Sequence, residues 1–104
     1  MSAEEFMKKS GIPVYLKGYE YAKEAIEIHV ENPSMFINEI INRIAEKRFY
    51  SYTAVERNIY NAVAKGYEYM DQEIKKIVFG MREEIPTTGQ FIIGASYAIR
   101  NKLI

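Results

Sequence analysis

Apolar side chains recur at every third or fourth position along most of the chain, and this periodicity constrains the fold more than any other feature. The strongest stretch begins at residue 35, where one stripe repeats about every 3.6 residues and consists of Ile37, Ile40, Ile41, Ile44 and Ala45. No segment shows the strict alternation of apolar and polar residues that a half-buried strand requires. The sequence therefore predicts an all-α protein.

Residues typical of helix ends divide the chain into about six helices. Ser2 and Glu5 have capping-box spacing, and Gly11 followed by Pro13 ends that first helix. A second amphipathic helix covers residues 17–30 and is stopped by "ENPS". This stretch offers Ser34 as the N-cap of a third helix over residues 35–48.

The same kinds of signal predict the last three helices. The fourth runs from about residue 53 to residue 69, the fifth from 71 to 80, and the sixth begins at 87. Their boundaries are marked by a capping box at Thr53 and Glu56, a cap at Asp71, a terminal glycine at Gly80, and a capping box at Thr87 and Gln90. We expect one helical domain over residues 1–104.

Composition excludes several classes of function. The 104 residues contain no cysteine, so disulfides and thiolate chemistry are absent. No apolar run is long enough to cross a bilayer, and the polar start "MSAEEFMKKSG" differs from a secretory signal, so we expect a cytoplasmic protein with no membrane partner. The net charge is zero, which is unusual for a nucleic-acid binder, although residues 34–70 are slightly positive.

The third and fourth helices are joined by a few residues, as in a helix-turn-helix over approximately residues 35–69. Projecting the fourth helix from its apolar seam at Ile59 places Arg57 and Asn61 on the opposite stripe. Arginine can donate two hydrogen bonds to guanine, and asparagine can bond the edge of adenine. The two residues are equally compatible with a solvated face on which Arg57 pairs with a neighbouring side chain.

A family resemblance favours DNA binding. The stretches "GIPVYLKGYEYAKEAI" (11–26), "IAEKRFYSYTAVERNIYNAV" (44–63) and "PTTGQFI" (86–92) resemble the DNA-binding effector domain of the sporulation master regulator, stage zero sporulation protein A. The resemblance implies a six-helix domain that binds double-stranded DNA as a homodimer on tandem sites, regulates transcription and contacts RNA polymerase. In that family a phosphoacceptor receiver domain precedes the effector. We expect this chain to be an excised effector domain or a stand-alone relative without phosphorylation control in the same chain.

The resemblance carries over to individual positions of the fourth helix. Val55, Glu56, Arg57 and Ile59 match the family pattern, whereas alanine and tyrosine replace arginines at 54 and 60 and asparagine replaces a histidine at 61. The match carries over Arg57 and Glu56 as predicted base contacts, and the projection of the helix adds Asn61 and the flanking Tyr60. The predicted backbone contacts are Thr53 at the helix N-terminus and Lys47, Arg48, Lys65 and Lys17.

Other features point to no separate chemistry. His29 is the only histidine and is expected at the surface, with no metal or cofactor site. Glu20, Glu24 and Glu27 form a predicted solvated face without a nucleophile, so we expect no enzyme. The last helix is apolar on more than one side, as an interface between two copies or complete burial would require. A non-enzymatic protein-interaction adaptor that has lost DNA binding is the alternative function.

Overall fold

The computed structural model describes residues 1–104, and all its regular elements are helical. This confirms the all-α prediction and the expected six helices. The elements in chain order are α1 (Ala3–Lys9), α2 (Lys17–Glu31), α3 (Ile37–Arg48), α4 (Tyr52–Gly66), the short 3-10 helix η1 (Tyr67–Tyr69), α5 (Gln72–Phe79) and α6 (Thr88–Arg100).

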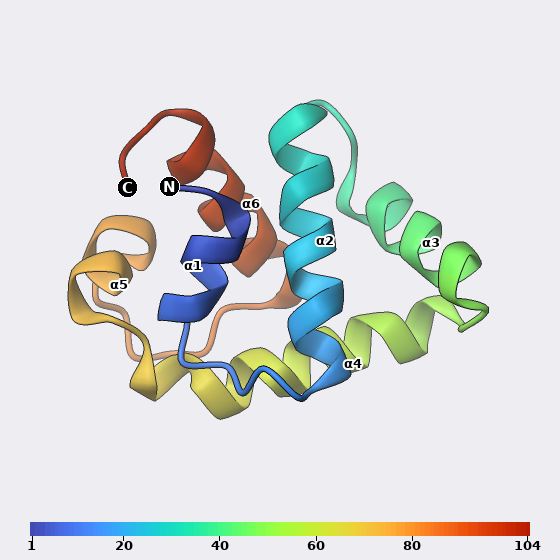
Figure 1. The fold of residues 1–104 in the computed structure, drawn as a ribbon, viewed down its shortest axis with the longest axis horizontal. Helices are drawn as coiled ribbons and strands as arrows, with labels where there is room; N and C mark the ends of the chain where they lie inside the picture. The colour runs from blue at the N-terminus through green and yellow to red at the C-terminus, as the bar shows by residue number, and fades with distance from the viewer.

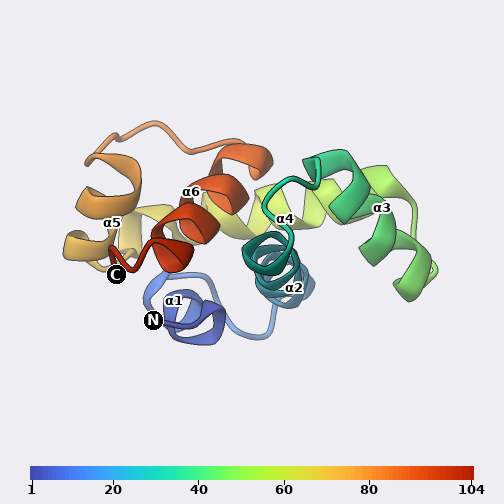
Figure 2. The same ribbon diagram turned by 90° about the horizontal axis from the view of Figure 1, so that it is seen from above.

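The central helix α2 connects the two ends of the molecule. It packs chiefly against α4 and α6, while α3 lies beside α2 and α4. In Figure 1, α4 runs along the lower edge, with α3 at one of its ends and α1, α5 and α6 toward the other. The view from above in Figure 2 shows α2 nearly end-on between α3 and the remaining helices. One long surface of α4 is therefore left on the outside of the bundle.

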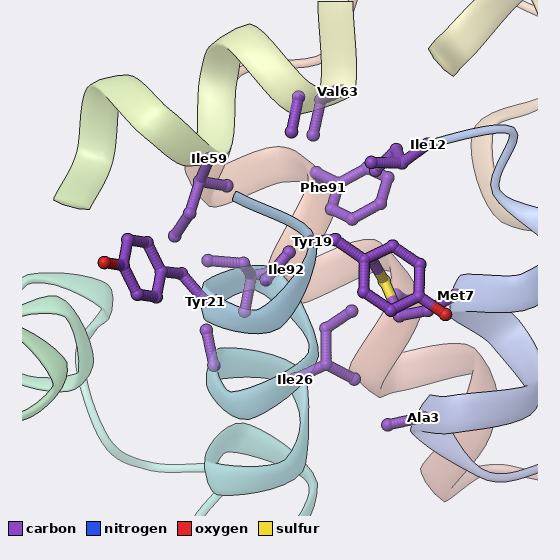
Figure 3. Close-up of a cluster of buried hydrophobic side chains, with 14 of the residues drawn as sticks. Ala3, Met7, Ile12, Tyr19, Tyr21, Ile26, Ile59, Val63, Phe91 and Ile92 are labelled. Carbon is purple, nitrogen blue, oxygen red and sulfur yellow. The ribbon is translucent and has the colours of Figure 1, made fainter. Parts of the chain in front are cut away.

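A single core joins these helices. It consists of 23 buried residues and includes Ile59 and Val63 from α4, and Phe91 and Ile92 from α6. Figure 3 shows these side chains pointing toward Tyr19 and other residues of the α2 segment. Burial of this apolar surface is what anchors α4 along one side.

Most predicted helix boundaries are confirmed. Both bonds of the capping box are present at Ser2 with Glu5 and at Thr87 with Gln90. The Asp71 side chain accepts a hydrogen bond from the backbone of α5, which ends at Gly80 in the left-handed conformation. These interactions are local, which is why the sequence alone indicates them.

Two predicted caps are wrong. The N-cap of α3 is Phe36 rather than Ser34, because residues 32–35 form a turn closed by a Met35 N–H bond to the Asn32 carbonyl. The N-cap of α4 is Ser51 rather than Thr53, and its hydroxyl accepts from the Ala54 backbone at 3.1 Å. Thr53 and Glu56 have the right spacing, but Ser51 starts α4 two residues earlier.

The prediction of a surface histidine is also wrong. His29 is buried, and its Nδ1 lies 2.7 Å from the Ser96 hydroxyl on α6. It follows Ile26 by three residues and so lies on the apolar side of α2, facing α6. Burial, together with the charge of Arg100, lowers the pKa of His29 below its ordinary value.

Candidate nucleic-acid interface

Helices α3 and α4 are joined by residues 49–51, a connection as short as the turn of a helix-turn-helix. Phe49 adopts the left-handed conformation, with φ of 59°, and the Tyr50 N–H donates to the Ala45 carbonyl at 2.9 Å. Phe49 therefore ends α3 in the left-handed conformation that glycine usually adopts at the end of a helix. Ser51 then caps α4, so the first turn of α4 begins at an exposed corner of the molecule (Figure 1).

The two sides of α4 differ in burial as the helical projection predicted. Val55, Ile59, Ala62, Val63 and Gly66 are buried. The predicted base contacts on the outward side are all exposed: Glu56, Arg57, Tyr60 and Asn61. Thr53 and Lys65, which were predicted to contact the DNA backbone, are exposed as well.

The Arg57 guanidinium is not paired within the fold. The four ion pairs of the molecule involve other cations, and Arg57 is exposed in the middle of α4. The structure therefore contradicts the alternative that Arg57 pairs with Glu56, Thr53 or a neighbouring helix. A free, exposed guanidinium keeps all five N–H donors for an external acceptor.

The predicted contact residues of α4 divide between two open hollows. Thr53, Glu56, Arg57 and Tyr60 line the first, of about 510 Å³, together with Ile37, Thr87, Thr88 and Gly89. The second hollow, of about 420 Å³, includes Asn61 and Lys65 together with Lys17 from the start of α2. The ridge between the hollows is the exposed stripe of α4. Arg57 and Asn61 therefore both lie on this ridge, and each borders a different hollow.

Lys17 is held by a tyrosine in the turn. Its Nζ donates to the Tyr50 hydroxyl at 2.8 Å and lies 5.0 Å from the centre of that ring. The hydrogen bond and the positive charge lower the pKa of Tyr50, and the same contact raises the pKa of Lys17. The start of α2 is thus tied to the turn, which sequence reasoning missed because these residues are far apart in the chain.

Lys47 and Arg48 converge on one carboxylate. Lys47 Nζ lies 2.9 Å from Glu24 Oε1, and Arg48 Nη2 lies 3.0 Å from Glu24 Oε2. Burial alone raises the pKa of Glu24, but the hydrogen bonds and charges of these two cations outweigh burial and lower it. The prediction that Glu24 belongs to a solvated face is wrong, because the end of α3 packs beside α2 and covers this side chain.

Charge varies along the exposed surface of α4. Lys17, Arg57 and Lys65 are exposed cations without an ion pair. Glu68 and Glu83 instead line a hollow beyond the C-terminal end of α4. An approaching polyanion therefore meets Arg57 and Lys65 on the body of α4, together with the exposed carboxylate of Glu56. Beyond the end of α4 it meets two carboxylates and the single cation Lys75. No group of three or more His, Asp or Glu side chains has a metal-binding arrangement.

Residues 3–99 match the family described as "Sporulation initiation factor Spo0A C terminal". The chain belongs to this family. The match runs from the first residue of α1 into the last turn of α6, and it confirms the resemblance drawn from the sequence. The Spo0A C-terminal family comprises DNA-binding regulator domains and is not a family of enzymes. No helix of this member has both the length and the apolar character needed to cross a bilayer.

Proposed function

We propose that this member of the Spo0A C-terminal family is a sequence-specific DNA-binding transcription regulator, with α4 as the recognition helix in the major groove. The observation that carries the proposal is the unpaired, exposed guanidinium of Arg57 on a helix whose opposite side is anchored in the core. A major groove accepts one helix, and the flanking hollows leave α4 as the ridge that enters it.

Each exposed side chain on α4 has a distinct role in this proposal. Arg57 donates two hydrogen bonds to guanine O6 and N7, and Asn61, about one turn further, pairs with adenine N6 and N7. Glu56 accepts from a cytosine amino group or orients Arg57. Tyr60 contacts a thymine methyl group or a phosphate. The base preference is therefore set mainly by Arg57 and Asn61.

Contacts to the DNA backbone position the helix without selecting a sequence. The Thr53 N–H, in the first turn of α4, has no acceptor within the fold and is free to bond a phosphate. Lys65 and Lys17 border one hollow beside α4 and are assigned to one strand. Lys47 and Arg48, at the end of α3, are assigned to phosphates near the turn.

We also assign pairing of two copies on tandem sites to α6. Ile93 and Tyr97 lie one turn apart on α6, and both are about half exposed. Apolar side chains of this size on one exposed helix face suit contact between proteins. The family relationship extends the proposal to contact with RNA polymerase, without assigning residues to it. The family relationship also leads us to assign this regulator to the cytoplasm.

The decisive experiment is selection of bound sites from a random duplex library, with wild type and Arg57→Ala in parallel. Wild type is expected to enrich a defined motif. Arg57→Ala is expected to lose preference at one base pair at a cost of about 1 to 3 kcal/mol. Lys65→Ala is the matched control, because loss of a phosphate contact weakens binding to all duplexes alike.

Two results would count against this proposal. Unchanged affinity and selectivity of Arg57→Ala would remove Arg57 from base recognition. Failure of the wild type to bind any duplex at low salt, where attraction to phosphate is strongest, would refute DNA binding and leave protein interaction as the function.

A further inference from the structure

Glu24 is the only carboxylate in the molecule that is ion-paired with two cations. The other two ion pairs, Lys23 with Glu4 and Arg82 with Glu84, are single contacts at 3.9 Å, at the distance limit for such pairs. The Glu24 side chain is 17% exposed, and both its oxygens are used, each by a different cation. The Glu24 carboxylate is therefore largely shielded from solvent in both of its ion pairs.

Both cations lie in the last turn of α3, immediately before the turn of the helix-turn-helix. In this motif the first helix crosses the DNA backbone, so cations at its end lie where phosphates approach. Arg57, Lys65 and Arg43, by contrast, form no ion pair. The fold therefore neutralises part of the charge at the phosphate-facing turn while leaving the cation of the recognition stripe free.

We propose that Glu24 is a specificity-determining residue that restrains sequence-independent attraction to DNA by holding Lys47 and Arg48. This inference rests on the DNA-binding function proposed above. A phosphate and a carboxylate offer the same kind of anionic oxygen acceptor, so a phosphate must displace Glu24 to bind either cation fully. Weak non-specific complexes consist of such phosphate contacts, whereas a specific complex also has its base contacts.

The two cations differ in how firmly they are held. The Arg48 guanidinium is also placed over the ring of buried Tyr21, 5.6 Å from its centre. The Lys47 side chain is 66% exposed and has no interaction of this kind. Lys47 is therefore the cation that becomes available first when the charge of Glu24 is removed, and Arg48 is the more firmly held of the two because it also contacts Tyr21 of α2.

The test compares Glu24→Gln with wild type on a random-sequence duplex and on the selected site, over a range of salt concentrations. The variant is expected to bind the random duplex more tightly, with a plot of log affinity against log salt steeper by about 0.9 for each additional phosphate that the protein neutralises. The affinity for the specific site should rise less, so the ratio of specific to random affinity falls. Glu20→Gln is the matched control, since it removes the same charge one turn earlier on α2, where there is no ion pair.

Two further variants separate this role from a purely structural one. Lys47→Ala alone is expected to weaken binding to the random duplex less than Lys65→Ala does, because the charge of Lys47 is already held by Glu24 whereas Lys65 forms no ion pair. In Glu24→Gln with Lys47→Ala, most of the added salt dependence is expected to disappear. Lys47 is mostly exposed, so Lys47→Ala keeps the inference testable even if Glu24→Gln destabilises the fold.

Several outcomes would overturn the inference. An unchanged salt dependence in a folded Glu24→Gln variant would show that Glu24 only braces α3 against α2. An equal effect of Glu20→Gln would show that only the net charge matters. A loss of random-duplex affinity in Lys47→Ala as large as that in Lys65→Ala would show that Glu24 does not restrain Lys47. Binding by Glu24→Gln but not by wild type would refute the proposed function and support this inference. Binding by neither would refute both.

Discussion

Replacing Gly18 by alanine tests the contact that holds α4 against α2. Gly18 is the second residue of α2, and a Cβ built on it would lie 2.1 Å from the Asn58 carbonyl oxygen and 2.6 Å from the Ala62 Cβ. Neither neighbour can rotate away, because one is backbone and the other is a methyl group. The added atom must therefore push α2 and α4 apart.

The size of the effect follows from two opposing contributions. Overpacking of a well-packed contact costs about 1 to 3 kcal/mol, and sometimes more. Alanine is favoured over glycine by at most about 1 kcal/mol of helix propensity. Because the contact distance is about 1 Å shorter than real Cβ atoms tolerate, we expect the clash to dominate. With the clash at the upper end of its range, about 3 kcal/mol, and the helix-propensity gain subtracted, Gly18→Ala should lower the free energy of unfolding by about 2 kcal/mol.

Urea denaturation followed by far-ultraviolet circular dichroism measures this change. Gly89→Ala is the matched control, because Gly89 is also the second residue of its helix and its nearest neighbour is Ile37 Cγ1 at 3.9 Å. That variant is expected to be as stable as wild type or more stable by up to about 1 kcal/mol. A Gly18→Ala variant as stable as wild type would refute the close approach of α2 to α4.

Two further predictions concern a buried group and a cap. Because burial lowers the pKa of His29, its contribution to stability is fully present above its ordinary pKa of 6.5 and is lost as the pH falls from there toward the folded-state pKa. Urea melts between pH 8 and about pH 5 should show a steeper loss for wild type than for His29→Gln, and parallel curves would contradict this. Ser51→Ala should reduce the free energy of unfolding by about 1 kcal/mol, whereas Thr53→Ala should change it little, and the reverse order in thermal melts would restore Thr53 as the cap.

Local signals in the sequence account for the helices. Ser2, Asp71 and Thr87 each bond a backbone group only three residues away, so the residue types and their spacing suffice to predict the caps. The exposed stripe of α4 follows from the 3.6-residue period in the same way. Thr53 was misleading because its spacing to Glu56 imitates a capping box, while Ser51 is the first residue after α3 whose side chain can cap a helix.

Contacts between helices determined the surroundings of the polar side chains, which the sequence did not predict. His29 meets Ser96 across 67 positions of the chain, and Glu24 meets Lys47 and Arg48 across 23 and 24. A periodic pattern reports which side of a helix is apolar, but it does not report which polar side chain of another helix comes to lie beside it. The order of helices and the outward placement of Arg57 were therefore readable from residues within a turn or two of each other. The burial of His29 and the ion pairs of Glu24 with Lys47 and Arg48 depend on packing between distant helices. Such packing removes a titratable group from water, and this changes the free energy of its charged form more than neighbours in the sequence do.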